Sequence, residues 1–559
     1  MKRKTGVFLM MFLLLVLASC KSIDYTVEFI FNDDENSTLT KVVKSGEVLE
    51  SFDVEYSKYG YIFDYWMDED TNKEFIFENT KIKSDKRLIG VWKSDGIRRG
   101  TFNREYPSYY EVNKPLIDDG HVVYINFDGF ARYYYDEAIK RDPNSLPTIT
   151  QIMSEGVFFD DLRTTTPSIT NPTQNMIISS ATTALTKNVY RYYDRDKNIV
   201  IQQARENEME TIVDRVVDAN LPIASISFYL AEPQLSPVDP ERLYIRPDST
   251  NPKVVERGEK RGGDYFSRFE QLIKLVKGEP IKTGGGTVVV EKLPKLIMIY
   301  ADDLDAHGHN QVENYGVPVS ASESERLDKM VKELREMDEK LGDFINAAKE
   351  AGVYDKMTFF FTTDHGMTPF GAISSSEGGK YIHSKIADLA YALSQFDRSF
   401  ELEKVEPEGK PQNRTTVVGV GANLNLQLTF RNGITDEELE ELKEHLLKEE
   451  YVGVVKTRKE LEEEGYWTYA ADMIVSPAER YSFAPNVLAQ YRVRGQHDSY
   501  LESANKIFGV VWGKGIKKGY VYEQRAYNYD FGITMAAALG LDLPQANGIV
   551  LDIFNIKED

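Results

Sequence analysis

The sequence contains a single cysteine, Cys20, among its 559 residues. A chain with one cysteine forms no intramolecular disulfide, so its stability must come from apolar cores or from bound metal. The sequence also lacks a basic excess, because its formal net charge is −22. General binders of nucleic acid or of anionic membranes need such an excess, so these classes are excluded. An anionic substrate must therefore meet local positive charge, and a bound metal would supply it.

An apolar run near the N-terminus, residues 6–17, is too short to span a membrane comfortably and follows three basic residues. This pattern predicts a secretory signal. The run ends in Leu17-Ala18-Ser19-Cys20, which resembles a bacterial lipoprotein signal cleaved to leave Cys20 as a lipidated N-terminus. The resemblance implies an extracytoplasmic protein of the bacterial cell envelope that meets the membrane only through its lipid anchor. The alternative is an ordinary signal followed by a chance cysteine.

Residues 24–95 combine alternating apolar positions, a turn-rich segment and an aromatic cluster, which together predict a small β-rich module. The segment resembles repeat modules of bacterial surface proteins, of the internalin B-repeat type. The residues that match the pattern are Gly60, Tyr61, Phe63, Trp66 and the closing Trp92. The pattern is broken at Tyr65, where glycine is usual. We expect a spacer, and the alternative is a module that contacts a surface or cell-wall partner.

Three apolar runs beyond residue 120 predict buried strands, at residues 121–127, 295–300 and 357–363. Runs of this length are typical of parallel strands covered on both faces. The charged, periodic segment from about 320 to 350 predicts a helix that crosses between two of them. The predicted fold class is therefore α/β, with a mostly parallel central sheet flanked by helices.

Each of these runs ends in possible metal ligands. Asp128 follows the first run, Asp305 and His309 follow the second, and Asp364 and His365 follow the third. Ligands of α/β sheets lie at the carboxyl ends of the strands, so these side chains are expected to meet. Carboxylate and imidazole together suit Zn²⁺ or Mn²⁺, whereas oxygen ligands alone would suit Ca²⁺ or Mg²⁺.

The segment 164–175, TTTPSITNPTQN, is rich in hydroxyl side chains and precedes an apolar stretch. Pro172 suits the first turn of a helix, with Thr170 or Asn171 at its cap, so the free amide groups of this helix end would attract an anion. A hydroxyl at this place is either a simple cap or a nucleophile that passes through a phosphorylated intermediate. His497 lies in a polar loop, where a core histidine is not expected.

These residues stand in the order of the functional residues of the alkaline phosphatase superfamily, in its type I phosphodiesterase and nucleotide pyrophosphatase branch. The resemblance runs from about residue 120 to the end of the chain. It implies two zinc sites, with Mn²⁺ as the alternative ion. One ion would be held by Asp305, His309 and His497, and the other by Asp128, Asp364 and His365. Thr170 would be the nucleophile and would form a phosphothreonine.

The sequence departs from the family where substrate is chosen. Diesterases usually have Asn after Thr-x-Pro, and phosphonoacetate hydrolases have a similar Thr-Asn-Pro-Asn, whereas Thr173 stands there in this chain. The family's phosphate-binding asparagine lies about twenty residues past the nucleophile, where Asn188, Tyr190 and Arg191 are the candidates. An inward Asn188 would favour a diester, and the guanidinium fork of an inward Arg191 would favour a monoester. Alternatively, Arg191 is an exposed residue at a helix end.

Residues 381–490 interrupt the α/β pattern and predict an inserted α+β cap. Insertions at this place in the family shape the pocket, so we expect the cap to set leaving-group preference. We interpret the charged stretch 236–292 as a surface excursion. The predicted organisation is a signal peptide at 1–20, the β-rich module at 24–95, the catalytic α/β domain at 120–380 and 491–559, and the cap at 381–490.

We predict a metal-dependent hydrolase of phosphoric esters. The leading interpretation is a phosphodiesterase or nucleotide pyrophosphatase that acts on a small phosphorylated substrate. A phosphomonoesterase or phosphonoacetate hydrolase on the same metal site is the first alternative, and a sulfatase is disfavoured because no Cys or Ser-x-Pro-x-Arg stands at the nucleophile. A non-catalytic surface scaffold is the alternative of another class, although a scaffold has no physical need for clustered carboxylates that repel one another.

Overall fold

The structure is a computed structural model that describes residues 23–52, 56–247, 265–311, 319–371, 382–484, 489–490 and 493–556. The predicted signal at 1–20, with Cys20, lies outside the described residues. The chain divides into two compact units, Met1–Arg98 and Arg99–Asp559. Within the described ranges, no helix is both long and apolar enough to cross a membrane.

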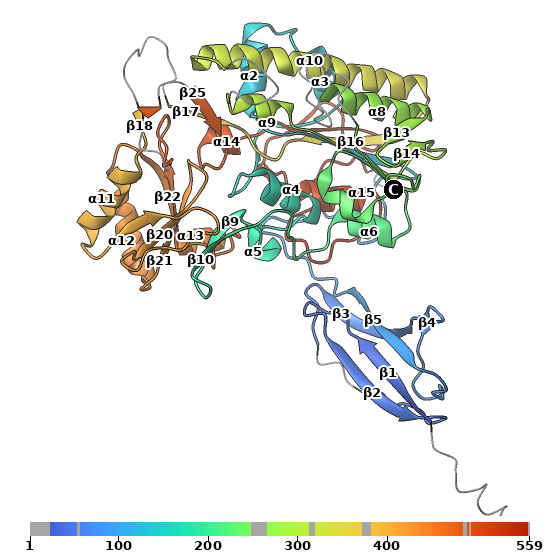
Figure 1. Ribbon diagram of the computed structural model, residues 1–559. Coiled ribbons are helices and arrows are strands. Elements are labelled where there is room, and N and C mark those ends of the chain that lie inside the picture. The colour runs from blue at the N-terminus through green and yellow to red at the C-terminus, as the bar shows by residue number, and fades with distance from the viewer. Residues whose placement is uncertain are drawn as a thin grey trace, which may run out of the picture. The chain divides into compact units, whose positions relative to one another are not determined.

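The first unit is a five-stranded sheet in the order β2-β1-β5-β3-β4 (Figure 1). Alternation along its strands turns aromatic side chains to one face. The Trp66 ring packs edge-on against Phe29 and Phe31, with ring centroids 4.9 and 5.0 Å apart. This confirms a small N-terminal β sheet, whereas its resemblance to internalin-type modules stays a prediction. The strands are β1 (Asp24–Ile30), β2 (Thr38–Lys44), β3 (Tyr61–Asp68), β4 (Lys73–Glu74) and β5 (Lys86–Ser94).

An eight-stranded sheet forms the centre of the second unit, in the order β12-β11-β15-β6-β16-β26-β7-β27. Strand β6 (His121–Phe127) pairs in parallel with β15 (Leu296–Ala301) and with β16 (Met357–Thr362). Strand β26 runs antiparallel to both of its neighbours. The predicted α/β class with a mostly parallel sheet is thus confirmed. The remaining strands are β7 (Gly156–Phe159), β11 (Ile223–Ile226), β12 (Arg242–Ile245), β26 (Val510–Gly513) and β27 (Tyr520–Tyr522).

Helices cover both faces of this sheet (Figure 1). Successive residues of β6 point to opposite faces, so Val123 and Ile125 join one core and Val122 and Tyr124 the other. One face is covered by α2 (Arg132–Arg141), α3 (Pro147–Glu155), α8 (Tyr265–Lys277) and α10 (Glu323–Glu350). The other is covered by α4 (Thr170–Ser179), α6 (Ile212–Asp218) and α15 (Asp530–Ala538). Helix α10 is the crossover helix expected at about 320–350.

The interpretation of 236–292 as a surface excursion is wrong for strand β12 and helix α8. Strand β12 lies at an edge of the central sheet, and helix α8 buries Phe269 and Leu272 in the core. The apolar positions of α8 recur three residues apart among charged neighbours, and this spacing was hidden by the overall polarity of the stretch.

Between β16 and β26 the chain builds a second sheet, in the order β19-β20-β21-β23-β22. Helices α11 (Ile386–Phe396) and α12 (Asp436–Leu446) share its core. The ribbon of β9 (Arg191–Asp194) and β10 (Ile199–Gln202) packs against this sheet through Tyr193, Val200 and Val418. The strands are β19 (Leu402–Lys404), β20 (Val417–Val420), β21 (Leu426–Phe430), β22 (Val452–Thr457) and β23 (Met473–Pro477), and α13 (Arg458–Glu463) follows β22.

Shorter elements complete the unit. They are β8 (Leu162–Arg163), α5 (Thr183–Thr186), η1 (Tyr229–Gln234), β13 (Ile281–Thr283), β14 (Gly286–Val288), α9 (Asp303–Gly308), η2 (Tyr354–Lys356), β17 (Thr368–Gly371), β18 (Ile382–His383), β24 (Ala489–Gln490), β25 (Val493–Gln496), α14 (Glu502–Asn505) and β28 (Ala526–Tyr527).

Candidate metal centre

Two groups of side chains that can bind a metal lie just past the carboxyl ends of four strands, which are β6, β15, β16 and β25. We call Asp128, Asp364 and His365 the buried group, and Asp305, His309 and His497 the pocket group. Within each group, one ligand atom of each residue lies within 4.8 Å of the other two. The structure therefore brings the six predicted ligands together in the two sets that the resemblance implied.

The buried group follows β6 and β16 directly. Asp364 Oδ1 accepts hydrogen bonds from the backbone amides of Gly129 and His365, at 3.3 and 3.0 Å. By contrast, Asp364 Oδ2 and Asp128 Oδ1 are buried and accept no hydrogen bond. A buried carboxylate oxygen without a partner is costly, so this arrangement fits a bound cation.

The pocket group comes from α9 and from the residue after β25. Asp305 Oδ1 lies 3.3 Å from His309 Nε2 and 3.6 Å from His497 Nε2, and it too accepts no hydrogen bond. Its side chain is 18% exposed, whereas that of Asp364 is fully buried. The pocket group is thus the one that solvent and substrate can reach.

The three imidazoles are oriented in the same way. In each ring Nδ1 faces a backbone carbonyl oxygen at 2.7 to 3.0 Å, and the pairs are His309 with Gly495, His365 with Gly366, and His497 with Ser168. A carbonyl oxygen only accepts, so each Nδ1 carries a proton, and in the neutral ring Nε2 is the atom left to bind a metal ion. Burial opposes the charged form of His309, but Asp305 outweighs it and raises the pKa of that ring, so metal binding there releases a proton.

The two groups adjoin and form one centre. The rings of His365 and His497 stack with their centroids 3.7 Å apart. The backbone amide of Asp305 donates to the carbonyl of Asp128 at 3.0 Å. A Cβ on Gly129, which has φ of 74°, would lie 2.8 Å from the Asp305 Cα, so glycine permits this close approach of the two loops.

Electrostatics differ between the groups. Burial, together with the neighbouring Asp364 carboxylate, raises the pKa of Asp128 well above its usual range. Burial also opposes ionisation of Asp305, but His309 and His497 outweigh it and lower the pKa of that carboxyl. Each group offers three ligands of mixed oxygen and nitrogen type, which suits zinc and leaves a position for substrate.

Thr170 begins helix α4 beside this centre. The N-cap is Ile169 in extended conformation, so the expectation that Thr170 or Asn171 caps the helix is wrong. With Thr170 as the cap, the helix would begin at Asn171, but it begins at Thr170. The Thr170 hydroxyl is therefore not used as a cap. Its Oγ1 lies 3.2 Å from His365 Nε2, while Asn171 Oδ1 accepts a 2.6 Å hydrogen bond from the Tyr229 hydroxyl.

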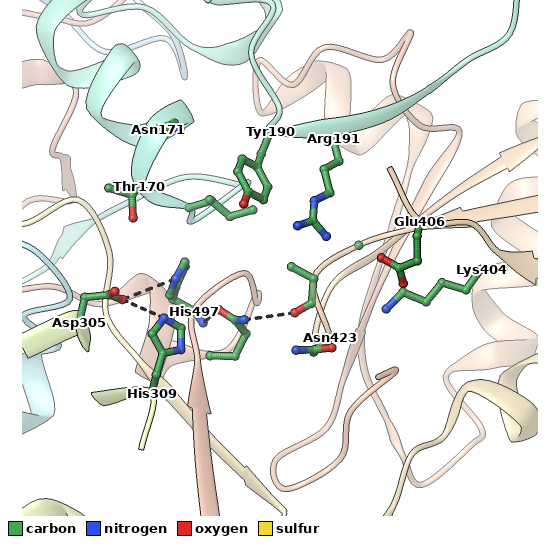
Figure 2. Close-up of a pocket in the computed structure, with 14 residues that line it drawn as sticks. Thr170, Asn171, Tyr190, Arg191, Asp305, His309, Lys404, Glu406, Asn423 and His497 are labelled. Atoms are coloured by element: carbon green, nitrogen blue, oxygen red, sulfur yellow. Dashed lines mark hydrogen bonds and ion pairs between the residues drawn. The ribbon is translucent and has the colours of Figure 1, made fainter. Parts of the chain in front are cut away.

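A cavity of about 470 Å³ opens beside the pocket group. Figure 2 shows Asp305, His309 and His497 at one end of it and Lys404 and Glu406 at the other. The lining residues are Ile169, Thr170, Asn171, Tyr190, Arg191, Asp305, His309, Lys404, Glu406, Gly421, Ala422, Asn423, Gln496 and His497.

The candidate substrate contacts separate in the structure. Arg191 and Tyr190 line the cavity, whereas Asn188 is fully buried and does not belong to the lining. Asn188 Nδ2 donates to the carbonyl of Glu206 at 2.8 Å, and its Oδ1 accepts from the backbone amide of Tyr190 at 3.0 Å. Asn188 therefore fixes the backbone that presents its two neighbours.

Several lining residues were missed by sequence reasoning. Lys404, Glu406, Asn423 and Gln496 belong to no recognisable motif, and all but Gln496 come from the inserted sheet. The only sequence signal for them was the position of the insertion, which indicated a role in the pocket without indicating which residues carry it.

The sequence matches the family model described as type I phosphodiesterase / nucleotide pyrophosphatase over residues 122–500, which include both ligand groups and Thr170. The chain belongs to this family. It is therefore a hydrolase of the phosphodiesterase and nucleotide pyrophosphatase class with two candidate metal-binding groups. No curated protein matches the chain.

Solved structures of similar fold include murine ectonucleotide pyrophosphatase / phosphodiesterase 5, with a TM-score of 0.51 and 15% identity over 76% of this chain and 96% of that one. An inactive variant of the same protein in complex with AMP gives the same values. The human protein of that name gives a TM-score of 0.48 at 15% identity, over 76% and 95% of the two chains. At such identity the likeness to the murine protein shows the fold alone.

Proposed function

We propose that this protein is a phosphodiesterase or nucleotide pyrophosphatase that acts through a phosphothreonine at Thr170 beside two zinc ions. The observation that carries the proposal is the Thr170 hydroxyl, 3.2 Å from His365 Nε2, within a centre where three buried carboxylate oxygens accept no hydrogen bond. Membership of the family supports the reaction class.

The residues present fit the metals. Asp128, Asp364 and His365 would hold one Zn²⁺ and the pocket group the other, with Mn²⁺ as the alternative. When bound, such a pair of ions lowers the pKa of the attacking hydroxyl and offsets the negative charge of the phosphoryl group. The Nε2 atoms and carboxylate oxygens of the six candidate ligands already lie close together within each group, so binding the ions needs little reorganisation of the protein.

The chain's own residues carry the covalent steps. Thr170 Oγ1 gives up its proton to solvent and attacks phosphorus, the bond to the leaving group breaks, and the leaving group departs with the electron pair and takes up a proton. The free amide groups at the start of α4 favour the anionic phosphoryl group at this position. Water then hydrolyses the phosphothreonine and restores the Thr170 hydroxyl.

A second candidate is favoured by one observation. Arg191 faces the cavity while Asn188 does not, and a guanidinium holds two oxygens of a dianionic phosphoryl group better than an amide does. This arrangement supports a phosphomonoesterase or phosphonoacetate hydrolase on the same metal centre.

The deciding experiment compares hydrolysis of bis-p-nitrophenyl phosphate and p-nitrophenyl phosphate by zinc-loaded protein that lacks residues 1–20. A ratio of rates well above one is expected, and a ratio well below one would replace the diesterase with the second candidate. Thr170→Ala protein provides the blank. A non-catalytic scaffold would remain if two results came together. The protein would turn over neither ester nor phosphonoacetate faster than the blank, and it would retain no zinc or manganese after dialysis.

We also propose that the mature protein is anchored to the bacterial envelope through a lipidated Cys20, with the N-terminal sheet as a spacer. The sequence pattern at 1–20 supports the anchor. Radiolabelled palmitate should enter the wild-type protein expressed in bacteria but not Cys20→Ser. Equal labelling of both would refute the anchor.

A further inference from the structure

The end of the cavity remote from the metal centre is built by the inserted sheet. Lys404 is the last residue of β19, Glu406 follows it, and Asn423 follows β20. Figure 2 shows Arg191 between this end and the pocket group, with its guanidinium turned into the cavity. A substrate with its phosphorus beside Thr170 has room to extend along the cavity toward Lys404.

Lys404 and Arg191, two cations that line the cavity, have few partners. Lys404 Nζ donates one hydrogen bond, to the carbonyl of Phe483 at 3.3 Å, and the Arg191 side chain donates through Nε to Gln202 Oε1 at 2.7 Å. Among the residues that the structure describes, no carboxylate pairs with either cation within 4.0 Å. Glu406 is nearby but exposed, so solvent screens it.

The charge on Lys404 is held at a cost. Burial lowers its pKa to about 8, Glu406 opposes this shift, and the positive charge of Arg191 adds to it. The ammonium is therefore still protonated at neutral pH, next to a second cation. An anionic group placed between them would relieve both the repulsion and the loss of hydration.

This end of the cavity is fixed relative to the metal centre. Gln496, next to the ligand His497, donates from Nε2 to the carbonyl of Ala422 at 3.2 Å. The backbone amide of Phe483 donates to the carbonyl of Asn423 at 2.6 Å, and Asn423 has φ of 108°, which residues with a side chain rarely adopt. A conformation of this kind persists where surrounding contacts impose it, as is common at binding sites.

We infer that Lys404, with Arg191 beside it, forms an anion subsite that selects phosphoric esters whose leaving group carries a second anionic group, a phosphate or a carboxylate. The inference rests on the proposed function and adds the class of substrate. Glu406 lies at the same end and weakens the hold on an anion, so its removal is expected to act in the opposite direction to removal of Lys404.

The test measures kcat/KM of the zinc-loaded protein for three substrates. The leaving group of bis-p-nitrophenyl phosphate carries no further anionic group. The leaving group of a dinucleoside pyrophosphate carries a phosphate, and that of phosphoglycolate carries a carboxylate. Lys404→Met should lower the ratio of anionic to reference substrate about tenfold, as loss of a charge-assisted contact does. Glu406→Gln should raise this ratio. The anionic substrate that shows the effect identifies the group bound.

The matched control is Lys410→Met, an exposed lysine of the same segment that does not line the cavity, and it should leave the ratios unchanged. An equal loss for all three substrates in Lys404→Met would mean a structural role and would overturn the subsite. A fall of the ratio in both Lys404→Met and Glu406→Gln would indicate a zwitterionic leaving group and would overturn it as well.

A binding measurement separates this inference from the proposed function. Calorimetric titration of inorganic pyrophosphate into zinc-loaded Thr170→Ala protein needs no turnover. Adding Lys404→Met should weaken this binding about tenfold, and an unchanged affinity would overturn the subsite. Absence of ester hydrolysis combined with the expected loss of binding would refute the proposed reaction and leave the anion subsite standing.

Discussion

The buried group and the pocket group use the same residue types in different surroundings. Asp364 and His365 are fully buried at the end of a central strand, whereas Asp305 and His309 are 18% and 16% exposed and line the cavity. The first group adjoins the Thr170 hydroxyl, and the second faces the inserted sheet. The central sheet therefore fixes the side of the centre that carries Thr170, the proposed nucleophile, whereas the other side is open to the cavity.

The largest expected effect comes from the hydroxyl beside the buried group. Thr170→Ala should lower kcat/KM at least about a thousandfold, because it removes the proposed nucleophile while the six candidate metal ligands remain. Zinc content should stay at the wild-type value, which mass spectrometry of the native protein would measure. Thr165→Ala, a change in the same loop whose hydroxyl contacts Met176 Sδ, is the matched control and should retain activity. Loss of zinc in Thr170→Ala would show that the hydroxyl supports the metals.

The next largest effect is a difference between the two groups in the rate at which they lose metal. A chelator should take the ion of the pocket group first and that of the buried group roughly tenfold more slowly, a difference of about 1.4 kcal/mol in barrier. Activity should disappear with the first ion. Zinc released into a colorimetric indicator would be followed against residual activity over time. A single phase of release, with both ions lost together, would remove the distinction between the groups.

The parts of this centre that follow local pattern were predictable from sequence. Apolar runs at 121–127 and 357–363 coincide with β6 and β16 to within one residue, because continuous burial and an abrupt polar end mark both limits of such a strand. The candidate ligands Asp128 and Asp364 then follow from the rule that the strand ends of α/β sheets hold bound ligands.

The parts that depend on tertiary approach were not predictable. Lys404 sits in a three-residue strand with no motif, and it reaches the cavity only because the inserted sheet packs against the ribbon of β9 and β10. The spacing from Thr170 likewise could not show whether Asn188 or Arg191 faces the cavity. Two backbone groups, at Glu206 and Tyr190, hold the Asn188 amide inside the turn, and such partners cannot be read from a single sequence.

Opposite effects on stability are expected when one carboxylate of each group is neutralised in metal-free protein. The pKa of Asp128 is raised, so its ionised form costs stability at neutral pH and Asp128→Asn should raise the free energy of unfolding by about 1 kcal/mol. The pKa of Asp305 is lowered, so its ionised form contributes stability above about pH 3.9. Asp305→Asn should therefore lower the free energy of unfolding by a similar amount.

Urea unfolding of chelator-treated protein at pH 7 would measure both Asp variants. Zinc-loaded samples serve as the control, in which both variants should be less stable than wild type because each loses a metal ligand. Changes of the same sign in the metal-free protein would mean that charge repulsion does not distinguish the two groups.

The last prediction tests the hydrogen bond that supports the buried group. The Tyr300 hydroxyl donates to Asp128 Oδ2, and Tyr300→Phe should weaken zinc binding at this group about tenfold, because partners of metal ligands orient them. Tyr229→Phe is the matched control: its ring lies 5.6 Å from that of Tyr300, but its hydroxyl serves Asn171. Competition with a zinc indicator would compare the variants. Both changes remove one oxygen from the same aromatic layer, so equal weakening would assign the orientation of Asp128 to ring packing rather than to the hydrogen bond.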